Sequence, residues 1–559
     1  MKRLKIWVIG AVIAAGALIS YSFADRYFEI SKNLDIFSSL FREVNIHYVD
    51  SVEPAKLMKT GIDAMLESLD PYTSYIPESD IEDYRSMTSG QYGGIGALIR
   101  QRGDNVIISD PYEGFPAQKS GLMAGDLIRE IDGKSVKGKT TSEISRMLKG
   151  SPKTSVKLLI ERPETKGTLE FQITRDEIKV GSVPYYGIVT EGIGYIRLSN
   201  FTEQAGKEVA EAMKKLKEEN TLKGVILDLR GNPGGLLHEA VSVTNVFIDK
   251  GQEVVSTKGK FREFDRTYRT INTPVETSLP LVVLVNSASA SASEIVSGSL
   301  QDLDRAVIAG QKTFGKGLVQ TTRSLSYNSQ LKITTSKYYI PSGRCIQSRN
   351  FSKRNEDGSA SIIPDSMMSE FKTRNGRKVF DGGGIQPDVT TESLKYSKIT
   401  SSLIEKNLVF DFANKYKAKN TSIAQAGKFR LSESDYTWFE AFISDKEYDY
   451  TTTSEAALEE LKKQTNNEKY YERIAPEFEA LRAKLMHNKQ DDVRNNKQEI
   501  SAALEEEIVN RYYFQKGRIQ KSLSNDPEIK KCIEILEDSA YYSGLLKGTL
   551  NANEERAKH

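Results

Sequence analysis

Three stretches of this sequence carry residue types that together can perform nucleophilic chemistry. The serine-rich run Asn286–Glu294 follows an apolar, strand-like segment, Leu281–Val285, and opens a helix-like one. A serine at such a turn is exposed for attack, and the N–H groups of the helix start can stabilise an oxyanion. The glycine-rich run Gly231–Gly235 and Lys316 each follow a further strand-like segment. Because catalytic groups gather at the carboxyl ends of strands in an α/β sheet, the three stretches predict one catalytic site.

A serine nucleophile needs a base, and the sequence offers two candidates. Lysine can serve only when it is neutral, which requires burial to lower its pKa. The glycines on both sides of Lys316 let the backbone pack closely, and its apolar neighbours can exclude water (Phe314, Leu318 and Val319). His238 would form the more usual serine–histidine pair. It is expected in the first part of the helix after the glycine run, where packing or exposure is its ordinary role.

Two glycine-rich stretches allow other ligands. Gly310–Gly317 nearly matches the phosphate-binding pattern GxxxxGK[ST], but Gly317 stands where a Mg²⁺-binding hydroxyl is required. The segment after it, Leu318–Thr322, predicts a strand and not the helix that the motif needs. Tyr92–Gly96 lacks the third glycine of a dinucleotide fingerprint. It fits a loop that turns N–H groups toward a peptide carboxylate, with an ordinary tight turn as the alternative.

The elements that must position these residues predict a multidomain α+β protein. Apolar residues recur at helical spacing early in the chain, short β-like runs with glycine turns follow, and then strands alternate with helices as in an α/β core. Beyond residue 400 the chain is charged, glycine-poor and helical in pattern. The expected parts are an N-terminal segment (1–24), a helical cap (25–87), a β-rich domain (88–180), an α/β core (181–395) and a mainly helical domain (396–559).

Composition excludes several classes of protein. The 559 residues carry a net charge of only +2, which argues against a nucleic-acid partner. The two cysteines, Cys345 and Cys532, form no CxxC pair, and the four histidines lie far apart without an HExxH pattern. These counts exclude a disulfide scaffold and an all-cysteine zinc site, and the sequence predicts no metal and no cofactor.

The N-terminus predicts export. A short basic patch precedes residues 6–24, which carry no charge, as in a secretory signal. Ser22 and Ala24 suit a cleavage site before Asp25, yet 19 such residues also suffice to span a bilayer. An uncut anchor in the inner membrane is slightly favoured over cleavage, with the remainder of the chain in the periplasm and no other membrane contact.

Several motifs resemble those of the C-terminal processing peptidases, or tail-specific proteases, which are serine–lysine proteases with a PDZ domain. They occur in the family's order across residues 35 to 390, and the resemblance does not reach the last 160 or so residues. The matching stretches are Tyr48–Asp50, Leu69–Ser74, Tyr92–Gly96, Pro116–Ile128, Leu227–Gly235, Ser289–Glu294, Thr313–Gln320, Thr334–Tyr339 and Gly384–Asp388.

The resemblance implies roles for particular residues. The middle serine of Ser289–Glu294, Ser291, matches the nucleophile, with Ser289 and Ser293 as alternatives. Lys316, 25 residues later, matches the base, and Gln320 matches the glutamine that orients it. The oxyanion hole would combine the Ala292 N–H with a glycine N–H of the loop that contains Gly234 and Gly235.

The β-rich domain is expected to be the PDZ domain. Its loop Gly93, Gly94, Ile95 and Gly96 would bind the substrate's C-terminal carboxylate while the tail adds as a strand at the domain's edge. In relatives this docking can control whether the protease site is assembled. Lys149 stands near the end of the PDZ helix where relatives often have arginine, so the charge is kept and bidentate geometry is lost.

The sequence therefore predicts an exported serine endopeptidase that takes protein or peptide substrates with free C-termini. The rival prediction is a PDZ peptide-binding scaffold on an inactive protease fold, which would require a lost catalytic residue. A homo-oligomer and the role of residues 401–559 stay open, since amphipathic patterns there suit a dimer surface, a lid or a partner platform alike.

Overall fold

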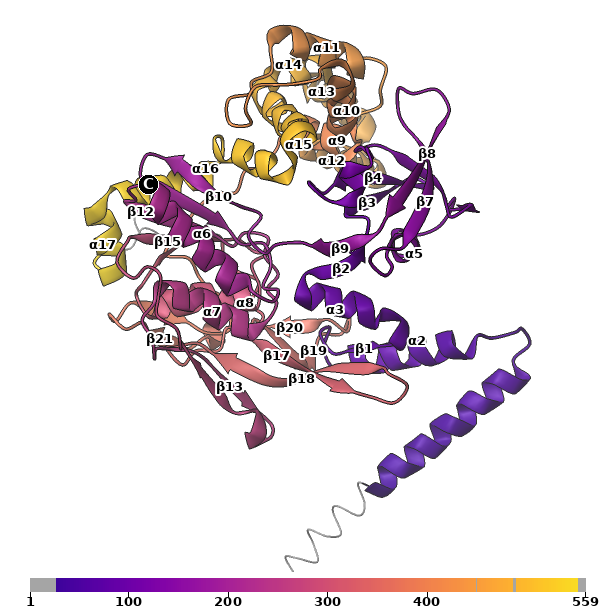
Figure 1. Ribbon diagram of the computed structural model, residues 1–559. Helices are drawn as coiled ribbons and strands as arrows, with labels where there is room; N and C mark the ends of the chain where they lie inside the picture. Colours follow the sequence, from indigo (N-terminus) through magenta and orange to yellow (C-terminus); the bar gives the residue numbers. More distant parts are fainter. Residues whose placement is uncertain (1–26, 449, 486–488, 551–559) are drawn as a thin grey trace, which may run out of the picture.

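The computed structural model describes residues 27–448, 450–485 and 489–550. A sheet with helices on both faces forms the largest body, and the PDZ domain and a group of C-terminal helices lie together beside it (Figure 1). The predicted N-terminal segment, residues 1–24, lies outside the described residues. Among the described helices, none is both long and apolar enough to cross a membrane.

The N-terminal part is helical, as its apolar spacing predicts. The helix over residues 27–47 extends away from the body, and its apolar side chains, among them Leu34 and Leu40, are exposed. The expected packing of these residues into a cap is therefore absent from the described chain. The elements that follow are α2 (Pro54–Glu67), β1 (Ser74–Ile76), the 3₁₀ turn η1 (Glu78–Asp80) and α3 (Ile81–Ser89).

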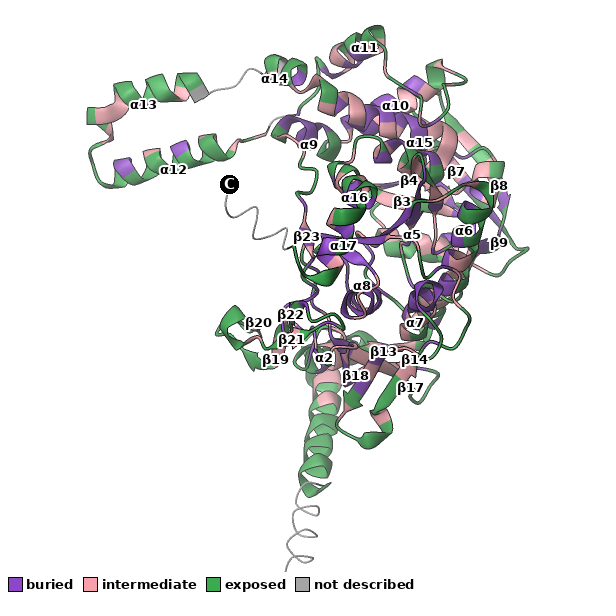
Figure 2. Ribbon diagram, turned by 90° about the vertical axis from the view of Figure 1, so that its left-hand side faces the viewer, coloured by how far each residue is buried: buried purple, intermediate pink, exposed green. Residues whose placement is uncertain are grey.

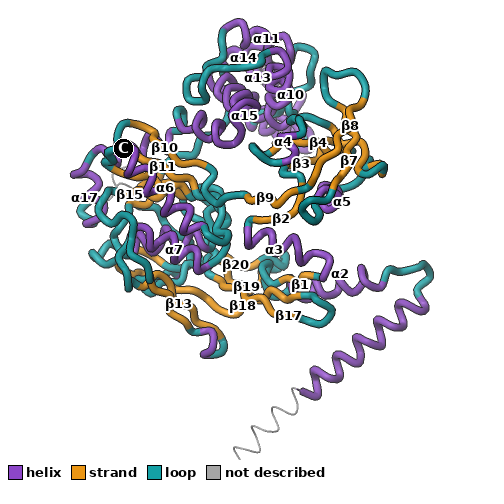
Figure 3. The backbone as a smooth tube through the Cα atoms, in the orientation of Figure 1, coloured by secondary structure: helices purple, strands orange, loops and turns teal. Residues whose placement is uncertain are grey.

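The PDZ domain is built on one antiparallel sheet in the order β3-β4-β5-β7-β8, with β6 beside β5. Strands β2 and β9 pair as a two-stranded ribbon that joins this sheet to the rest of the chain (Figure 3). Strand β3 is an edge strand, which leaves its outer side free for β-augmentation. The elements are β2 (Gln91–Gly94), β3 (Ala97–Arg102), β4 (Asn105–Pro111), α4 (Pro116–Lys119), β5 (Leu127–Ile131), β6 (Lys134–Ser135), α5 (Thr141–Leu148), β7 (Ser155–Glu161), β8 (Thr168–Thr174) and β9 (Asp176–Lys179).

The core sheet has the order β10-β11-β12-β15-β16-β23, and all its pairs except β10–β11 are parallel. The apolar runs at β12 and β15 are buried throughout, as parallel strands covered on both faces require. The elements are β10 (Tyr185–Thr190), β11 (Ile193–Arg197), α6 (Ala205–Glu219), β12 (Gly224–Asp228), α7 (Leu237–Phe247), β15 (Leu281–Val285), α8 (Ala292–Asp302), β16 (Val307–Gly310) and β23 (Val389–Thr390).

A second sheet stands next to the first and carries part of the site. Its order is β1-β18-β13-β14, with β17 paired to β18, so the short N-terminal strand β1 joins strands from residues 253–339. Two further hairpins complete this region. The elements are β13 (Glu253–Gly259), η2 (Arg262–Phe264), β14 (Arg266–Arg269), β17 (Leu318–Ser324), β18 (Gln330–Tyr339), β19 (Arg349–Arg354), β20 (Ala360–Ile362), η3 (Asp365–Met367), β21 (Glu370–Lys372) and β22 (Lys378–Phe380).

The C-terminal part contributes to two separate cores. Helices α9 to α15, here called the helical domain, enclose their own apolar cluster, and α12 and α13 project from it as a largely exposed pair (Figure 2). Helix α15 is interrupted at Phe514, whose φ of 53° is left-handed. The elements are α9 (Lys398–Glu405), α10 (Leu408–Lys419), α11 (Glu433–Ile443), α12 (Thr453–Asn467), α13 (Tyr471–Leu485), α14 (Lys489–Asn495) and α15 (Lys497–Leu523).

The last two helices pack on the core sheet. Helices α16 (Pro527–Glu537) and α17 (Ser539–Lys547) bury Ile529, Ile535 and Leu545 against strand residues such as Ile226 and Val282. They cover the face opposite α6, α7 and α8, which pack on the other side of the same strands. The range 396–559, expected as one helical unit, thus supplies both the helical domain and one layer of the α/β core.

Candidate active site

One cleft brings together all the residues expected to act in catalysis. Its volume is about 840 Å³, and it lies between the start of α8, the glycine loop after β12, strands β17 and β18, and the junction of α3 with the PDZ domain. The predicted residues that line it are Ser291, Lys316, Gln320, Ala292, Gly234, Gly235 and Lys149.

Ser291 stands at the turn between β15 and α8, where the sequence places it. It precedes the first residue of α8 and has a φ of 56°, a left-handed conformation that is strained for serine. The same turn carries the alternatives Ser289 and Ser293, which are both fully buried. The Ser289 hydroxyl donates to the Leu229 carbonyl (2.8 Å), and that of Ser293 donates to the Asn232 carbonyl (2.9 Å). The geometry therefore favours Ser291, whose side chain faces the cleft.

Glu294 ties the serine turn to the lysine loop, a role that sequence reasoning missed. Its fully buried carboxylate accepts hydrogen bonds from the Ser291 N–H (2.8 Å), the Gly315 N–H (2.7 Å), the Lys316 N–H (2.9 Å) and the Thr313 hydroxyl (2.6 Å). Burial raises the pKa of Glu294 to about 7, although these hydrogen bonds oppose the shift. The only sequence signal was its position three residues after Ser291 in the matched motif.

We expect Glu294→Gln to lower kcat by about tenfold or more and to lower Tm. An amide offers one acceptor oxygen, so its NH₂ group would face N–H groups that now donate to the carboxylate. The measurement is kcat beside thermal unfolding. Glu239→Gln is the matched control, because this buried carboxylate accepts from the Gln204 and Gly206 N–H groups outside the cleft. It should lower Tm and spare kcat. A Glu294→Gln enzyme with wild-type kcat would contradict the positioning role.

Lys316 lies in an environment that favours its neutral form. Burial and, to a smaller extent, the positive charge of Lys332 on β18 lower the pKa of its amine to about 8, against the opposing effect of Glu294 and Asp70. The amine lies 4.3 Å from the centroid of the Tyr72 ring. In the part of the chain that the structure describes, no hydrogen bond joins this amine to the Ser291 hydroxyl.

Tyr338 and Gln320 hold the lysine side of the cleft. The buried Tyr338 hydroxyl donates to the Lys316 carbonyl (2.5 Å) and reaches the Ser291 carbonyl at 3.2 Å, so it links both loops. The Gln320 amide donates to the Thr334 hydroxyl (3.1 Å) on the neighbouring strand β18. The Thr334 N–H donates a hydrogen bond to the Thr73 hydroxyl (3.2 Å), and the two hydroxyls lie 3.4 Å apart. These contacts attach the matched Leu69–Ser74 motif to this wall.

The two glycines of the expected oxyanion hole differ in what their N–H groups do. Gly234 donates its N–H to the Asn232 side chain (2.9 Å), and a Cβ on Gly234 would lie 2.8 Å from that of Ser291. Gly235 pairs with Phe201 through the Gly234 carbonyl and the Leu236 N–H, so its own N–H takes no part in that bridge. Ala292 opens α8, and its N–H has no partner within the helix. Ala292 and Gly235 are thus the available donors.

The expected carboxylate loop lies at the entrance of the PDZ domain. Gly93 and Gly94 belong to β2, and the Ile95 and Gly96 carbonyls accept from Ala117 and Tyr112. A Cβ on Gly93 would lie 2.1 Å from the Gly150 carbonyl, so only glycine allows this approach.

Lys149 sits beside this loop, and its amine is paired with a carboxylate of another element. It forms an ion pair with Asp83 of α3 (2.5 Å) and lies over the Tyr92 ring. It therefore connects the PDZ domain to α3 at the edge of the cleft.

Arg230 brings the C-terminal helices into contact with the site. It precedes the glycine loop and pairs with Asp228 (2.8 Å), and its other nitrogen contacts Asp526 (2.8 Å) and Glu528 (2.7 Å) at the start of α16. These ion pairs join residues almost 300 positions apart in the sequence, and no sequence motif predicted them.

The alternative sites are less well formed. His238 lies in the first turn of α7 with its side chain mostly exposed. Leu318–Ser324 is the strand β17, so no helix follows the Gly310–Gly317 loop. Among the described residues, no three His, Cys, Asp or Glu side chains form a group suited to a metal ion.

Comparisons with known proteins agree with this architecture. The family model "Peptidase family S41" matches residues 192–354, "PDZ domain" matches 107–162, and "Probable PDZ-protease, C-terminal helical domain" matches 399–536. A carboxy-terminal-processing protease of Bartonella bacilliformis is 41% identical over 319 residues, covering 56% of this chain and 73% of the relative. A probable CtpA-like serine protease of Staphylococcus aureus is 32% identical over 444 residues, covering 78% and 80%.

Among solved structures, a photosystem II D1 C-terminal processing protease is 28% identical, with a TM-score of 0.35, and it covers 65% of this chain and 94% of its own. The fold, the cleft and the sequence relatives together define a serine-type peptidase that carries a PDZ domain. More specifically, the chain belongs to peptidase family S41, the C-terminal processing proteases. The predicted family and fold class are thereby confirmed.

Proposed function

We propose that Ser291 and Lys316 are the nucleophile and base of an endopeptidase that cuts protein substrates near their C-termini. The observation that carries this proposal is the cleft. It contains a half-buried serine on a strained turn, a lysine whose pKa burial lowers to about 8, and two available N–H donors. The direct test is the release of fragments from an unfolded protein by the wild-type chain and by Ser291→Ala.

The reaction has two halves. The neutral Lys316 amine takes the proton of the Ser291 hydroxyl as its oxygen attacks the scissile carbonyl, and the Ala292 and Gly235 N–H groups stabilise the oxyanion. Collapse breaks the C–N bond, and the lysine ammonium gives its proton to the departing amine. Water then hydrolyses the acyl-enzyme, with the lysine again acting as base, and Ser291 is regenerated. Gln320 keeps β17 in register with β18 beside the lysine.

The substrate's tail is proposed to bind the PDZ domain through its free carboxylate. Loop 93–96 lies at the start of the edge strand β3, so a tail can add to β3 with its carboxylate at that loop. The buried side chain of Ile95 and its apolar neighbours favour an apolar C-terminal residue.

Amidation of a substrate's C-terminus is expected to lower kcat/KM by about tenfold or more, the equivalent of about 1.4 kcal/mol. The amide removes the charge that strengthens the hydrogen bonds from the loop. Matched peptides, one free and one amidated, should be compared in steady-state cleavage assays. Equal rates would show that the domain does not read the terminus.

Two further proposals concern the whole chain. The N-terminal basic and apolar pattern supports export, with the enzyme acting in the periplasm. The rival, a binding scaffold on an inactive protease fold, is disfavoured because Ser291, Lys316 and Gln320 are all present and line one cleft. Binding of phosphate at the Gly310–Gly317 loop is disfavoured by the strand that follows it.

A further inference from the structure

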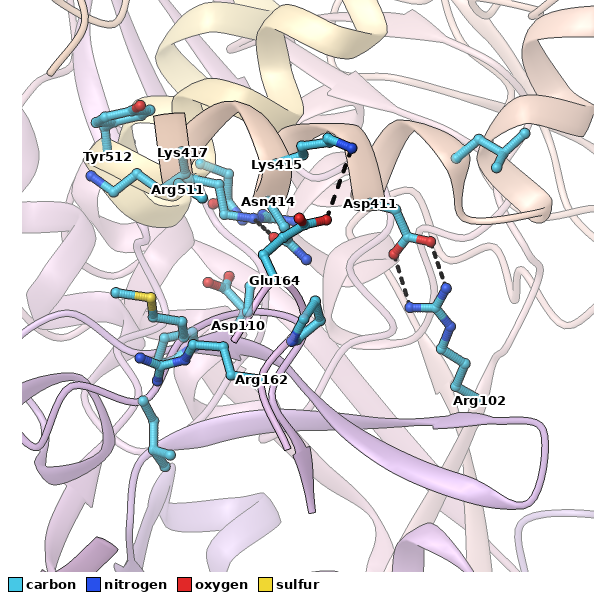
Figure 4. Close-up of a pocket in the computed structure, with 18 of the residues that line it drawn as sticks. Arg102, Asp110, Arg162, Glu164, Asp411, Asn414, Lys415, Lys417, Arg511 and Tyr512 are labelled. Atoms are coloured by element: carbon cyan, nitrogen blue, oxygen red, sulfur yellow. Dashed lines mark hydrogen bonds and ion pairs between the residues drawn. The ribbon is translucent and has the colours of Figure 1, made fainter. Parts of the chain in front are cut away.

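A second large cavity lies apart from the catalytic cleft, between the PDZ domain and the helical domain. Its volume is about 1020 Å³. One wall comes from the ends of β3 and β4 and from the loops at residues 121–124 and 162–164, and the other comes from α10, α11 and the kink of α15. Figure 4 shows that Arg102 and Asp411, and likewise Glu164 and Lys415, point toward one another from the two walls.

Specific contacts hold the two walls together. Arg102 at the end of β3 forms a two-pronged ion pair with Asp411 of α10, at 2.8 and 2.5 Å (Figure 4). Arg100 on the same strand lies over the Phe410 ring, 4.1 Å from its centroid. The cavity is therefore a part of a fastened interface between the domains, and bidentate arginine pairs of this kind fix geometry well.

The lining is rich in positive charge. Basic side chains outnumber acidic ones by seven to four. Five of these basic side chains already have an acidic partner, in the lining or just outside it: Arg102 with Asp411, Arg162 with Asp126, Lys415 with Glu164, Lys446 with Asp445 and Arg511 with Glu507. Lys406 and Lys417 have no acidic partner among the described residues, and Lys417 lies over the Tyr512 ring. Lys406 and Lys417 are therefore the positive charges that the cavity can offer to an acidic segment.

Arg511 supplies a buried donor that lacks an acceptor. Its side chain is only 5% exposed; Nε donates to Asn414 (2.6 Å) and Nη2 to Glu507 (2.8 Å), whereas Nη1 has no partner. The carbonyl oxygen of the neighbouring buried Asn510 is also without a partner. A buried polar group left unpaired is costly, and a carboxylate in the cavity would satisfy the guanidinium.

Two lining carboxylates, Asp110 and Glu447, form no ion pair with the described residues. Burial raises the pKa of Asp110, and the charge of Arg511 opposes that shift.

The cavity lies close to the expected position of the upstream residues of a substrate tail bound to the PDZ domain. A tail that adds to β3 with its carboxylate at loop 93–96 must run antiparallel to β3. Its C-terminal residue then lies beside Ala97, and its upstream residues lie toward Arg102. At about 3.3 Å per residue, the six residues of this strand match the last six or so of the tail. Residues further upstream then emerge beside Arg102, at the rim of the cavity.

We propose that this cavity binds an acidic segment of the substrate that lies upstream of the C-terminal residues held by the PDZ domain. The inference rests on the proposed function, because it extends the same tail-binding site. The helical domain then contributes a second recognition site, which selects substrates with aspartate and glutamate upstream of the apolar C-terminal residue.

The test uses the full chain with Ser291→Ala, so that binding is measured without cleavage. Three fluorescent peptides share the same four C-terminal residues and carry an acidic, a neutral or a basic segment at the seventh to tenth residues from the end. We expect the acidic peptide to bind about tenfold more tightly than the basic one at low salt. The preference should shrink as salt rises, because part of it comes from exposed charges.

The variant Lys406→Gln with Lys417→Gln removes the two positive charges of the cavity that have no acidic partner among the described residues. It should reduce the preference for the acidic peptide to about threefold or less, and leave the neutral peptide unchanged. The matched control is Lys398→Gln with Lys428→Gln, two exposed lysines of the helical domain that do not line the cavity. This control should keep the full preference.

Equal affinity for the acidic and basic peptides would overturn the proposal, and so would an equal loss in the control variant. Either result leaves the proposed function intact if the wild-type enzyme still cleaves and still distinguishes free from amidated termini. If amidation has no effect while the preference for the acidic peptide persists, the PDZ domain does not bind the terminal carboxylate. That result would also contradict the proposed path of the tail from the PDZ domain to the cavity.

Discussion

Ser291→Ala is expected to abolish proteolysis, with a loss in kcat/KM on the order of 10⁴-fold or more. The hydroxyl is the only group at the cleft-facing position of the turn between β15 and α8 that can form an acyl-enzyme. Alanine keeps the backbone N–H that donates to Glu294, so the fold should be preserved. Fragment release from an unfolded protein, followed by gel or mass spectrometry, provides the measurement.

Ser289→Ala and Ser293→Ala are the matched controls for this substitution. Each removes a buried hydroxyl and leaves a backbone carbonyl without its hydrogen bond, so we expect a stability loss of about 1–2 kcal/mol with catalysis retained. Activity that survives in Ser291→Ala and disappears in one of these controls would assign the nucleophile to the other serine.

Lys316→Ala should lower kcat/KM by about 10³-fold, and Lys316→Arg should be almost as inactive. Arginine keeps the positive charge and cannot lose its proton near neutral pH, so it separates a base from a structural cation. A Lys316→Arg enzyme with near wild-type activity would show that the lysine is not the base.

The pH profile of the wild-type enzyme gives a second readout for the same residue. The reactive form of Lys316 is the neutral amine, so kcat/KM should rise with pH along a limb centred near the pKa of about 8. About a tenth of the amine is neutral at pH 7 and about nine-tenths at pH 9, which predicts a roughly tenfold increase.

Lys332→Gln should move this limb to higher pH. The Lys332 ammonium lowers the pKa of Lys316, and its removal makes protonation of Lys316 easier. Rates measured from pH 6 to 10 for both proteins would decide the matter, with Lys312→Gln as a control that leaves the cleft lining unchanged. An unshifted limb in Lys332→Gln would rule out this coupling between the two lysines.

The sequence by itself predicted many of the local elements, and it supplied the candidates for the reacting groups. The apolar run Leu281–Val285 is strand β15 residue for residue, and the helix after the serine turn is α8. Such features are encoded within short windows by side-chain size, polarity and glycine placement. Residue type brought a serine and a lysine forward as candidates, and the resemblance to the family selected Ser291 among the three serines of the turn.

The tertiary structure decided what surrounds those groups. Glu294 was read as one letter of a motif, yet its buried carboxylate joins the serine turn to the lysine loop. Lys332 lies on another strand, and its effect on the pKa of Lys316 depends on the pairing of β17 with β18. Gly234 and Gly235 differ because the Gly234 N–H donates a hydrogen bond to the Asn232 side chain, a contact that spacing does not encode.

The C-terminal helices illustrate the same limit most clearly. Their amphipathic pattern predicted helices correctly, but an apolar stripe does not specify which surface will cover it. Helices α9, α10, α11 and α15 bury their stripes on one another, whereas α16 and α17 bury theirs on the protease sheet, where Glu528 meets Arg230. Whether two segments hundreds of residues apart pack together depends on the shape and charge of the surfaces that the fold brings together, and the sequence pattern of one helix does not contain that information.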